Sequence, residues 1–311
     1  MPRLIETDAA DAIELGDLVE ALQTGGFDPD DEESVAAFGP ALKKLGNNRR
    51  FLGDLMVEEL KQRCAGQLAR NQYSAQVFLL HIGSGKFTLR ANFWPAAADS
   101  VMLNSGSDPF FYGLPHDHNF TFLTVGYIGP GYWSDYYEYE YDQVVGYAGE
   151  KVDLRFVERS RLEPGQVLLY RKHRDVHLQM PPDEMSVSLN ILAVSRTSDF
   201  RDQYKFDVER REVAALINPS GLEALVGLAG RFGGENGRDL VDSFAERHPS
   251  ERVRFAAVRA QAAAGDIDDR IAVYERAAGR YGGFVGAMAA REATRVQATR
   301  GWIEGGLRRG G

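Results

Sequence analysis

The sequence predicts an α+β protein in which an antiparallel β-barrel lies between two helical segments. Short runs of alternating apolar and polar residues fill positions 71–200, and Gly, Pro, Asp or Asn bounds each run. Many short strands with few helices between them favour a closed barrel over a parallel sheet. Apolar residues recur at helical spacing before this segment, and the chain after it is rich in alanine.

The chain divides into four predicted segments. Residues 1–70 form an N-terminal helical segment, because their apolar residues recur every three or four positions. Residues 71–200 form the barrel. Residues 207–300 form a C-terminal helical domain that resembles a HEAT-like repeat, with an ordinary helical bundle as the alternative. Residues 301–311, which are rich in glycine and arginine, are expected to be a flexible tail.

The composition of the chain limits the kinds of molecule that it is expected to bind and the compartment in which it is expected to lie. An apolar fraction of 44% in 311 residues supports a sizeable core, and a net charge of −9 without a Lys/Arg-rich block argues against nucleic acid. The single cysteine, Cys64, cannot form an internal disulfide, which fits a reducing compartment. The first residues, MPRLIETDAADAIEL, are acidic where a signal peptide is basic, and no run approaches the ~20 apolar residues of a membrane helix. We therefore expect a cytoplasmic protein without a membrane partner.

Four of the six histidines fall in two close pairs. Side chains alternate along a strand, so His116 and His118 would point the same way while Asp117 points away. The second pair is His173 and His177, in RKHRDVHLQM. Imidazole nitrogens that share one face can bind one metal ion at ~2.0–2.1 Å. Strand alternation therefore predicts a metal site that combines His116 and His118 with the second pair.

These residues lie in segments that resemble a known superfamily. GLPHDHNFTF (113–122) resembles the first cupin motif, in which His-x-His opens a barrel strand. EPGQVLLY (163–170), followed by His177, resembles the second motif, and SVSLNIL (186–192) resembles the next strand of the Jumonji-like branch. The resemblance covers roughly 110–195. It implies a cupin-type barrel, the double-stranded β-helix, with helical N-terminal and C-terminal extensions. It also implies His116, His118 and His177 as the metal ligands, with His173 as a residue behind these ligands or an alternative ligand.

Two departures from the family patterns affect the chemistry. Many cupins carry a glutamate ligand four or five residues after the second histidine, where Phe122 and Leu123 stand here. Jumonji-like hydroxylases use His-x-Asp, whereas position 118 is a histidine. The remaining all-histidine triad resembles that of thiol dioxygenases. By this resemblance we expect Fe(II), with Zn(II) or another divalent metal as the alternative.

Other candidate site residues come from the strands around the histidines. Tyr170 could donate a phenol hydrogen bond at the site, and Glu138 could act as a base or fourth ligand. Arg90 and Arg171 are candidate carboxylate-binding residues. Tyr137 belongs to the aromatic hairpin GYIGPGYWSDYYEYEYDQVVGY, for which packing is the favoured interpretation and a substrate-stacking wall the alternative.

The function predicted from these observations is a non-haem iron oxygenase. Its expected substrate is a small molecule or an amino-acid or peptide side chain. One alternative is a 2-oxoglutarate-dependent hydroxylase of Jumonji-like type. The other is a non-catalytic metal- or ligand-binding cupin that recruits a protein partner through its C-terminal helices. Stoichiometric metal is required by an oxygenase and not by a partner-binding barrel.

Overall fold

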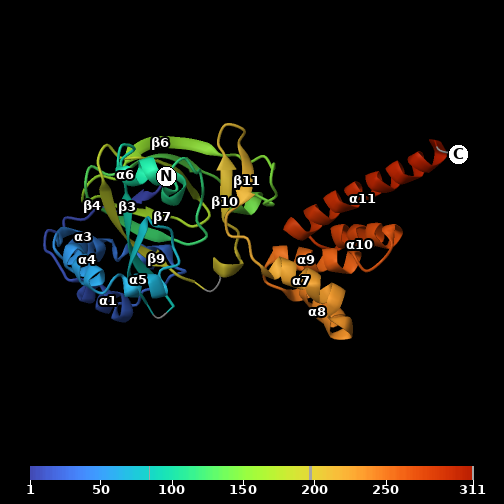
Figure 1. Ribbon diagram of the computed structural model, residues 1–311, viewed down its shortest axis with the longest axis horizontal. Coiled ribbons are helices and arrows are strands. Elements are labelled where there is room, and N and C mark those ends of the chain that lie inside the picture. The colour runs from blue at the N-terminus through green and yellow to red at the C-terminus, as the bar shows by residue number, and fades with distance from the viewer. Residues whose placement is uncertain (84, 196–197, 310–311) are drawn as a thin grey trace. The chain divides into compact units, whose positions relative to one another are not determined.

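A computed structural model describes residues 1–83, 85–195 and 198–309 of the chain (Figure 1). The chain forms two compact units. The first comprises Met1–Tyr141, Lys151–Asp199 and Gln203–Ala214, and the second comprises Asp142–Glu150, Phe200–Asp202 and Ala215–Gly311. The first unit holds most of the strands and the second holds the C-terminal helices, so each is described separately.

Two antiparallel sheets form the centre of the first unit. The larger sheet has the order β1-β7-β4-β9-β3-β2 and the smaller has the order β6-β5-β8. The strands of the larger sheet are β1 (Arg3–Leu4), β2 (Val77–Ile82), β3 (Phe87–Trp94), β4 (Phe122–Ile128), β7 (Val167–Tyr170) and β9 (Ser186–Ala193). Those of the smaller sheet are β5 (Trp133–Glu138), β6 (Arg155–Arg161) and β8 (Asp175–Met180).

This pairing confirms the predicted antiparallel strands but not a closed barrel. Within the described residues the strands pair as separate sheets, which gives a jelly-roll-like arrangement. A further two-stranded sheet, β10 (Tyr204–Asp207) with β11 (Glu212–Leu216), was not expected from the sequence. Strand periodicity shows which residues share a face and not which strands pair at the edges, so it does not determine whether the ring closes.

One face of the six-stranded sheet carries the main apolar core. Leu89, Leu123 and Leu189 on its strands are at most 1% exposed and cluster with Leu18 and Leu42 from the N-terminal helices. At Gly46 an added Cβ would lie 3.3 Å from the Val125 side chain, so this glycine lets a helix approach the sheet closely. The N-terminal helices are α1 (Leu15–Thr24), α2 (Glu32–Ala36), α3 (Gly39–Asn47), α4 (Phe51–Lys61) and α5 (Ala65–Arg70).

The other face of this sheet packs against the smaller sheet. Buried aromatic residues from both sheets form one cluster, which includes Trp94, Phe122, Tyr136 and Tyr170. The hydroxyls of Tyr136 on β5 and Tyr170 on β7 are 3.0 Å apart and connect the sheets directly. The connections in this unit also contain α6 (Ser100–Ser105) and η1 (Asp108–Phe110), while η2 (Tyr141–Gln143) and η3 (Ser198–Phe200) span points where the chain passes from the first unit to the second. The space between the sheets therefore contains aromatic and polar groups together.

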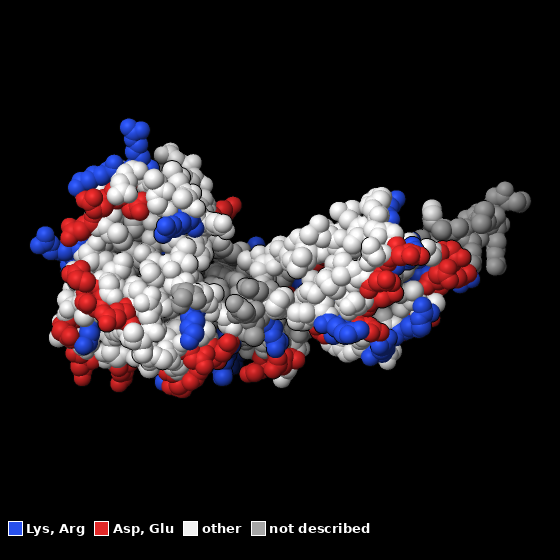
Figure 2. Space-filling model, turned by 90° about the horizontal axis from the view of Figure 1, so that it is seen from below, with Lys and Arg blue, Asp and Glu red and all other residues white. Residues whose placement is uncertain are grey.

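The second unit consists of helices that pack around a core of alanine, valine and aromatic side chains. They are α7 (Leu222–Phe232), α8 (Gly234–Arg247), α9 (Glu251–Ala262), α10 (Ile267–Arg280) and α11 (Gly283–Arg309). Ser250 caps α9 by accepting a hydrogen bond from the Val253 N–H, and Asp266 starts α10 with a capping box. In the part of the chain that the structure describes, no helix combines the length and apolarity needed to cross a bilayer. Figure 2 shows acidic and basic side chains interspersed on one face.

Candidate metal centre

Backbone pairing brings the two histidine motifs together. His116 forms an isolated antiparallel bridge with His177 on β8, in which each N–H donates to the other residue's carbonyl at 3.1 and 3.0 Å. The structure differs from the sequence prediction in one respect, because β4 begins only at Phe122. The His-x-His motif therefore lies just before a strand rather than opening it.

Alternation of side chains still holds across this motif. Asp117 is fully buried, and its carboxylate accepts hydrogen bonds from the Tyr139 hydroxyl and the Tyr204 N–H, both at 2.6 Å. These bonds hold Asp117 on the side away from the histidine rings. His116 and His118 consequently share the other side, with ring centroids 4.9 Å apart.

The three histidine rings converge through their Nε2 atoms. Nε2 of His177 lies 3.1 Å from Nε2 of His118 and 3.2 Å from Nε2 of His116. Nitrogens that bind one ion at ~2.1 Å with angles of ~90–110° are ~3.0–3.4 Å apart. The residues are 5%, 7% and 1% exposed, for His116, His118 and His177, and they form a group able to hold a metal ion. The structure thus brings together the three predicted ligands.

The electrostatics of the site keep these rings neutral. Burial lowers the pKa of His116 to about 4. Burial, together with the charge that neighbouring histidines would carry, holds the pKa of His118 and of His177 well below the usual range. Nδ1 of His116 lies 2.8 Å from the Leu114 carbonyl and donates to it, which leaves a lone pair on Nε2. Neutral rings with free Nε2 lone pairs are the form of histidine that binds metal.

The ring of one tyrosine lies beside that of His177. Tyr170, at 1% exposure, stacks on Phe122 at 4.4 Å, and its ring centroid is 5.0 Å from that of His177. Burial raises the pKa of Tyr170 and of Tyr132, and hydrogen bonds with Tyr170 and Gln179 offset the rise at Tyr132 only in part. Both phenols are therefore neutral hydrogen-bonding groups.

Sequence reasoning had assigned no site role to Tyr132 or Gln179. Gln179 is two residues beyond His177 on β8 and shares its face, so the alternation rule could have found it. Its Oε1 is buried without a hydrogen-bond partner among the described residues. Tyr132 precedes β5, and its place at the site depends on how the two sheets pack.

Arg90 on β3 is directed between the sheets, because its neighbours Leu89 and Ala91 belong to the opposite, apolar face. Its guanidinium lies over the Tyr73 ring at 5.2 Å. Nε of Arg90 is shielded from solvent and has no hydrogen-bond partner among the described residues. The positive charge of Arg90 also contributes to the low pKa of all three histidines.

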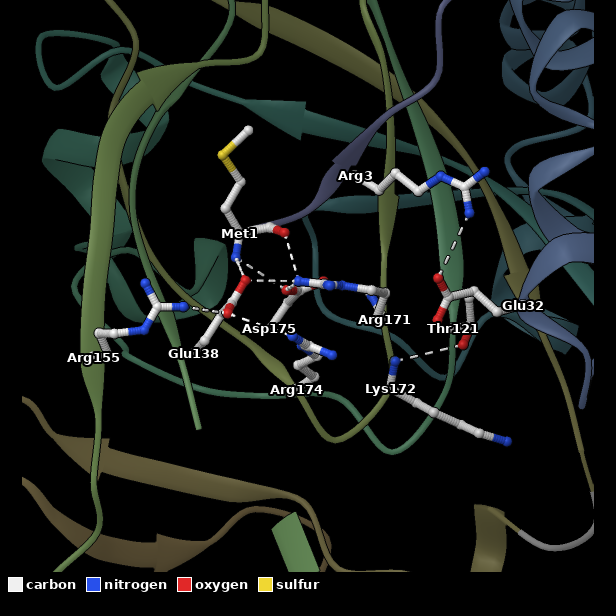
Figure 3. Close-up of polar contacts among 10 residues, drawn as sticks. All are labelled: Met1, Arg3, Glu32, Thr121, Glu138, Arg155, Arg171, Lys172, Arg174 and Asp175. Carbon is white, nitrogen blue, oxygen red and sulfur yellow. Dashed lines mark hydrogen bonds and ion pairs between the residues drawn. The ribbon is translucent and has the colours of Figure 1, made fainter. Parts of the chain in front are cut away.

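Glu138 and Arg171 lie in a charged cluster next to the site, drawn in Figure 3. Arg171 donates to Glu138 at 2.9 Å and to Asp175 at 2.5 Å, and Arg155 donates to Glu138 at 2.6 Å. Burial alone would raise the pKa of Glu138, but hydrogen bonds from the Met1 amino group and Arg171 lower it to about 2. Glu138 is thus an ion-paired carboxylate, and within the described residues it does not join the three-histidine group.

Tyr137 and His173 lie apart from the converging nitrogens. Tyr136 points between the sheets, so Tyr137 points to the other face of β5, where its ring meets Phe156 edge-on at 5.4 Å. His173 has a left-handed backbone with φ of 59°, stacks on Tyr141 at 3.9 Å, and donates its N–H to the His118 carbonyl at 2.8 Å. His173 therefore contacts the backbone of the metal motif rather than the group of Nε2 atoms.

A scan against protein-family models and a search of curated protein sequences give no match. Among solved structures, the chain is similar to the DMSP lyase DddQ from Ruegeria pomeroyi DSS-3, with 12% identity, a TM-score of 0.24, and 39% of this chain and 47% of that chain covered. That match spans about half of the lyase.

Two further solved structures give similarly low identities and TM-scores. The DMSP lyases RdDddP and RnDddQII give 10% identity, a TM-score of 0.20, and coverage of 62% of this chain and 78% of theirs. Prolyl 4-hydroxylases from Phytophthora capsici give 12% identity and a TM-score of 0.23. The match covers 83% of this chain and 75% of that chain. Similarity at this level assigns neither fold nor function, so the site is interpreted from its own residues.

Proposed function

We propose that the chain is a metal-dependent enzyme, and specifically a non-haem iron(II) oxygenase acting on a small molecule or an amino-acid or peptide side chain. The observation that supports this is the convergence of three buried histidines, in which Nε2 of His177 lies 3.1 Å from Nε2 of His118 and 3.2 Å from Nε2 of His116. Neutral imidazoles at this spacing present lone pairs to a common point. A divalent cation would stabilise this arrangement, whereas one N–H at Nε2 of His177 could donate to only one of the other two Nε2 atoms.

The donor set fits a divalent transition metal. His116, His118 and His177 would hold the ion, and their nitrogens suit iron or zinc better than magnesium or calcium. Iron(II) bound by three imidazoles supplies open coordination positions for dioxygen and for a chelating substrate. The departure from a carboxylate-containing ligand set favours this assignment over a 2-oxoglutarate-dependent hydroxylase.

The remaining residues would bind and orient the substrate. Tyr170 and Tyr136 can donate hydrogen bonds from phenols that burial keeps protonated. Arg90, whose Nε lacks a partner among the described residues, can bind an anionic substrate group. Arg171 and Glu138, as members of the ion-paired cluster, would act chiefly by fixing the β5–β8 edge beside the histidines.

Oxygen consumption by the iron-loaded protein tests this function. Uptake is measured with panels of small molecules and amino acids, with and without 2-oxoglutarate, and with the zinc-loaded protein as the control. The proposal expects uptake that requires iron and does not require 2-oxoglutarate. Uptake that requires 2-oxoglutarate would favour the hydroxylase, and a folded protein that binds no metal would contradict any metalloenzyme.

A further inference from the structure

An open groove crosses one side of the helical second unit. Its lining comes from α7, α9, α10 and α11, and its volume is about 830 Å³. All of its lining residues lie between Glu223 and Arg295, within the second unit. The groove is therefore a feature of this unit by itself and is independent of the histidine site.

Arginines dominate the charged lining of the groove. Four arginines and two glutamates line it, so it carries a net positive charge in a chain of net charge −9. Arg295 is paired with Glu292 at 2.6 Å. Across residues 1–83, 85–195 and 198–309, no ion pair is formed by Arg231, Arg259 or Arg270. Nε of Arg270 is in addition buried without a hydrogen-bond partner in that part of the chain.

The floor of the groove is made of small residues. Gly227 and Gly230 on α7, Ala256 and Ala260 on α9, and Ala263, which follows α9, all line it, and a Cβ added at Gly230 would lie 3.0 Å from Cβ of Ala260. A Cβ added at Gly227 would meet no atom within 4 Å, so this position opens directly into the groove. A helix interior normally disfavours glycine by ~1 kcal/mol relative to alanine. The small side chains leave room for a polypeptide backbone to lie between the arginines.

We propose that this groove binds an acidic peptide segment that carries several neighbouring Asp or Glu side chains. Its carboxylates pair with Arg231, Arg259 and Arg270, and its backbone lies on the glycine and alanine floor. Arginine favours such a ligand because its planar guanidinium binds carboxylates through two parallel hydrogen bonds. Arginines from separate helices around one groove suit a ligand with several carboxylates better than a single small anion.

Fluorescence anisotropy with a fluorescein-labelled hexaglutamate peptide tests the proposal on the full chain. Two variants change the groove: the double charge reversal Arg231→Glu/Arg259→Glu, and Gly227→Leu, which fills the floor while improving helix propensity. Arg238→Glu on α8 is the matched control, because Arg238 is exposed and lies outside the groove lining. Circular dichroism melts confirm that each variant is folded.

The proposal expects saturable binding that weakens at higher ionic strength. Each lost arginine–carboxylate ion pair of ~1 kcal/mol should weaken binding about fivefold. The double reversal removes two such pairs and is therefore expected to weaken binding by about 25-fold or more. Gly227→Leu should weaken it by at least about tenfold, and Arg238→Glu should leave it within about twofold. Absence of saturable binding, equal weakening by Arg238→Glu, or inorganic phosphate binding as tightly as the peptide would overturn the proposal.

Discussion

The two faces of the six-stranded sheet carry different chemistry although they belong to the same strands. On β9, Leu189 and Ile191 are fully buried in the apolar core against the N-terminal helices. Between them, Asn190 points to the other face, where its Oδ1 accepts hydrogen bonds from Thr124 and Ser188 at 3.3 Å. One face therefore stabilises the fold through apolar burial, and the other presents hydrogen-bonding groups near the histidines.

This difference indicates that, in the first unit, one face of the six-stranded sheet mainly stabilises the fold and the other face carries the polar groups of the candidate site. The apolar face holds the strands in register through burial of aliphatic side chains, and the other face adds buried aromatic residues among its polar groups. The polar face can then keep an atom such as Arg90 Nε without a partner in the described residues, at a cost that the apolar core offsets. Substitutions on the two faces should accordingly have separable effects.

The largest effect on stability is expected at the apolar face. Leu189→Ala removes a fully buried side chain, and we expect a loss of ~2–5 kcal/mol in the free energy of unfolding. Metal content of the folded fraction should not change, because Leu189 points away from the histidines. Urea unfolding and metal analysis of the same preparations measure both quantities. Leu189→Met, which conserves volume, should cost under ~1.5 kcal/mol.

The buried histidines beside the polar face should make the metal-free protein sensitive to acid. Burial holds the pKa of His116 at about 4, against 6.5 for an exposed ring, so the unfolded chain binds more protons between these values. Stability is therefore complete above pH 6.5 and falls as the pH is lowered toward 4, by up to roughly 3 kcal/mol from this residue. Denaturant unfolding across that range measures the loss. A stability that rises on acidification would contradict the burial of neutral rings.

A smaller effect is expected from the phenol pair. Tyr170→Phe removes the hydroxyl that lies 3.0 Å from the Tyr136 hydroxyl, and the loss of this hydrogen bond should cost ~1 kcal/mol. If Tyr170 orients substrate, turnover should fall by about tenfold while metal content stays the same. Turnover equal to that of the unchanged protein would remove Tyr170 from the catalytic proposal.

The smallest effect is expected on the outer face of β5. Tyr137→Ala loses an edge-on contact with the half-exposed Phe156 ring, so we expect a stability loss of about 1 kcal/mol or less. Metal content and substrate affinity should be unaffected, because the ring points away from the histidines. A clear loss of substrate affinity would instead support the predicted substrate-binding role of Tyr137.

Local pattern was sufficient to predict the histidine group. His116 and His118 are two residues apart, and His177 follows a Pro-Gly turn and a buried strand, so each position could be inferred from a short stretch. The antiparallel strands were predictable for the same reason. Alternation between buried and polar positions is encoded within five to eight residues.

Contacts between distant segments could not be predicted in this way. The ion pairs of Glu138 with Arg155 and Arg171 depend on the pairing of β5 with two neighbours, which no single strand encodes. The same holds for Tyr132, which reaches the site only because the two sheets pack face to face. Strand pairing and sheet packing are set by the whole chain, so these residues emerged only from the structure.

Metal stoichiometry of purified variants tests the central claim most directly. Each of His116→Ala, His118→Ala and His177→Ala is compared with the unchanged protein and with His81→Ala, a histidine outside the three-histidine group. We expect about one tightly bound divalent ion in the unchanged protein and in His81→Ala. We expect none in the three variants, which should keep the circular dichroism of the folded protein. Full metal content in His177→Ala would contradict a metal site built from these three histidines.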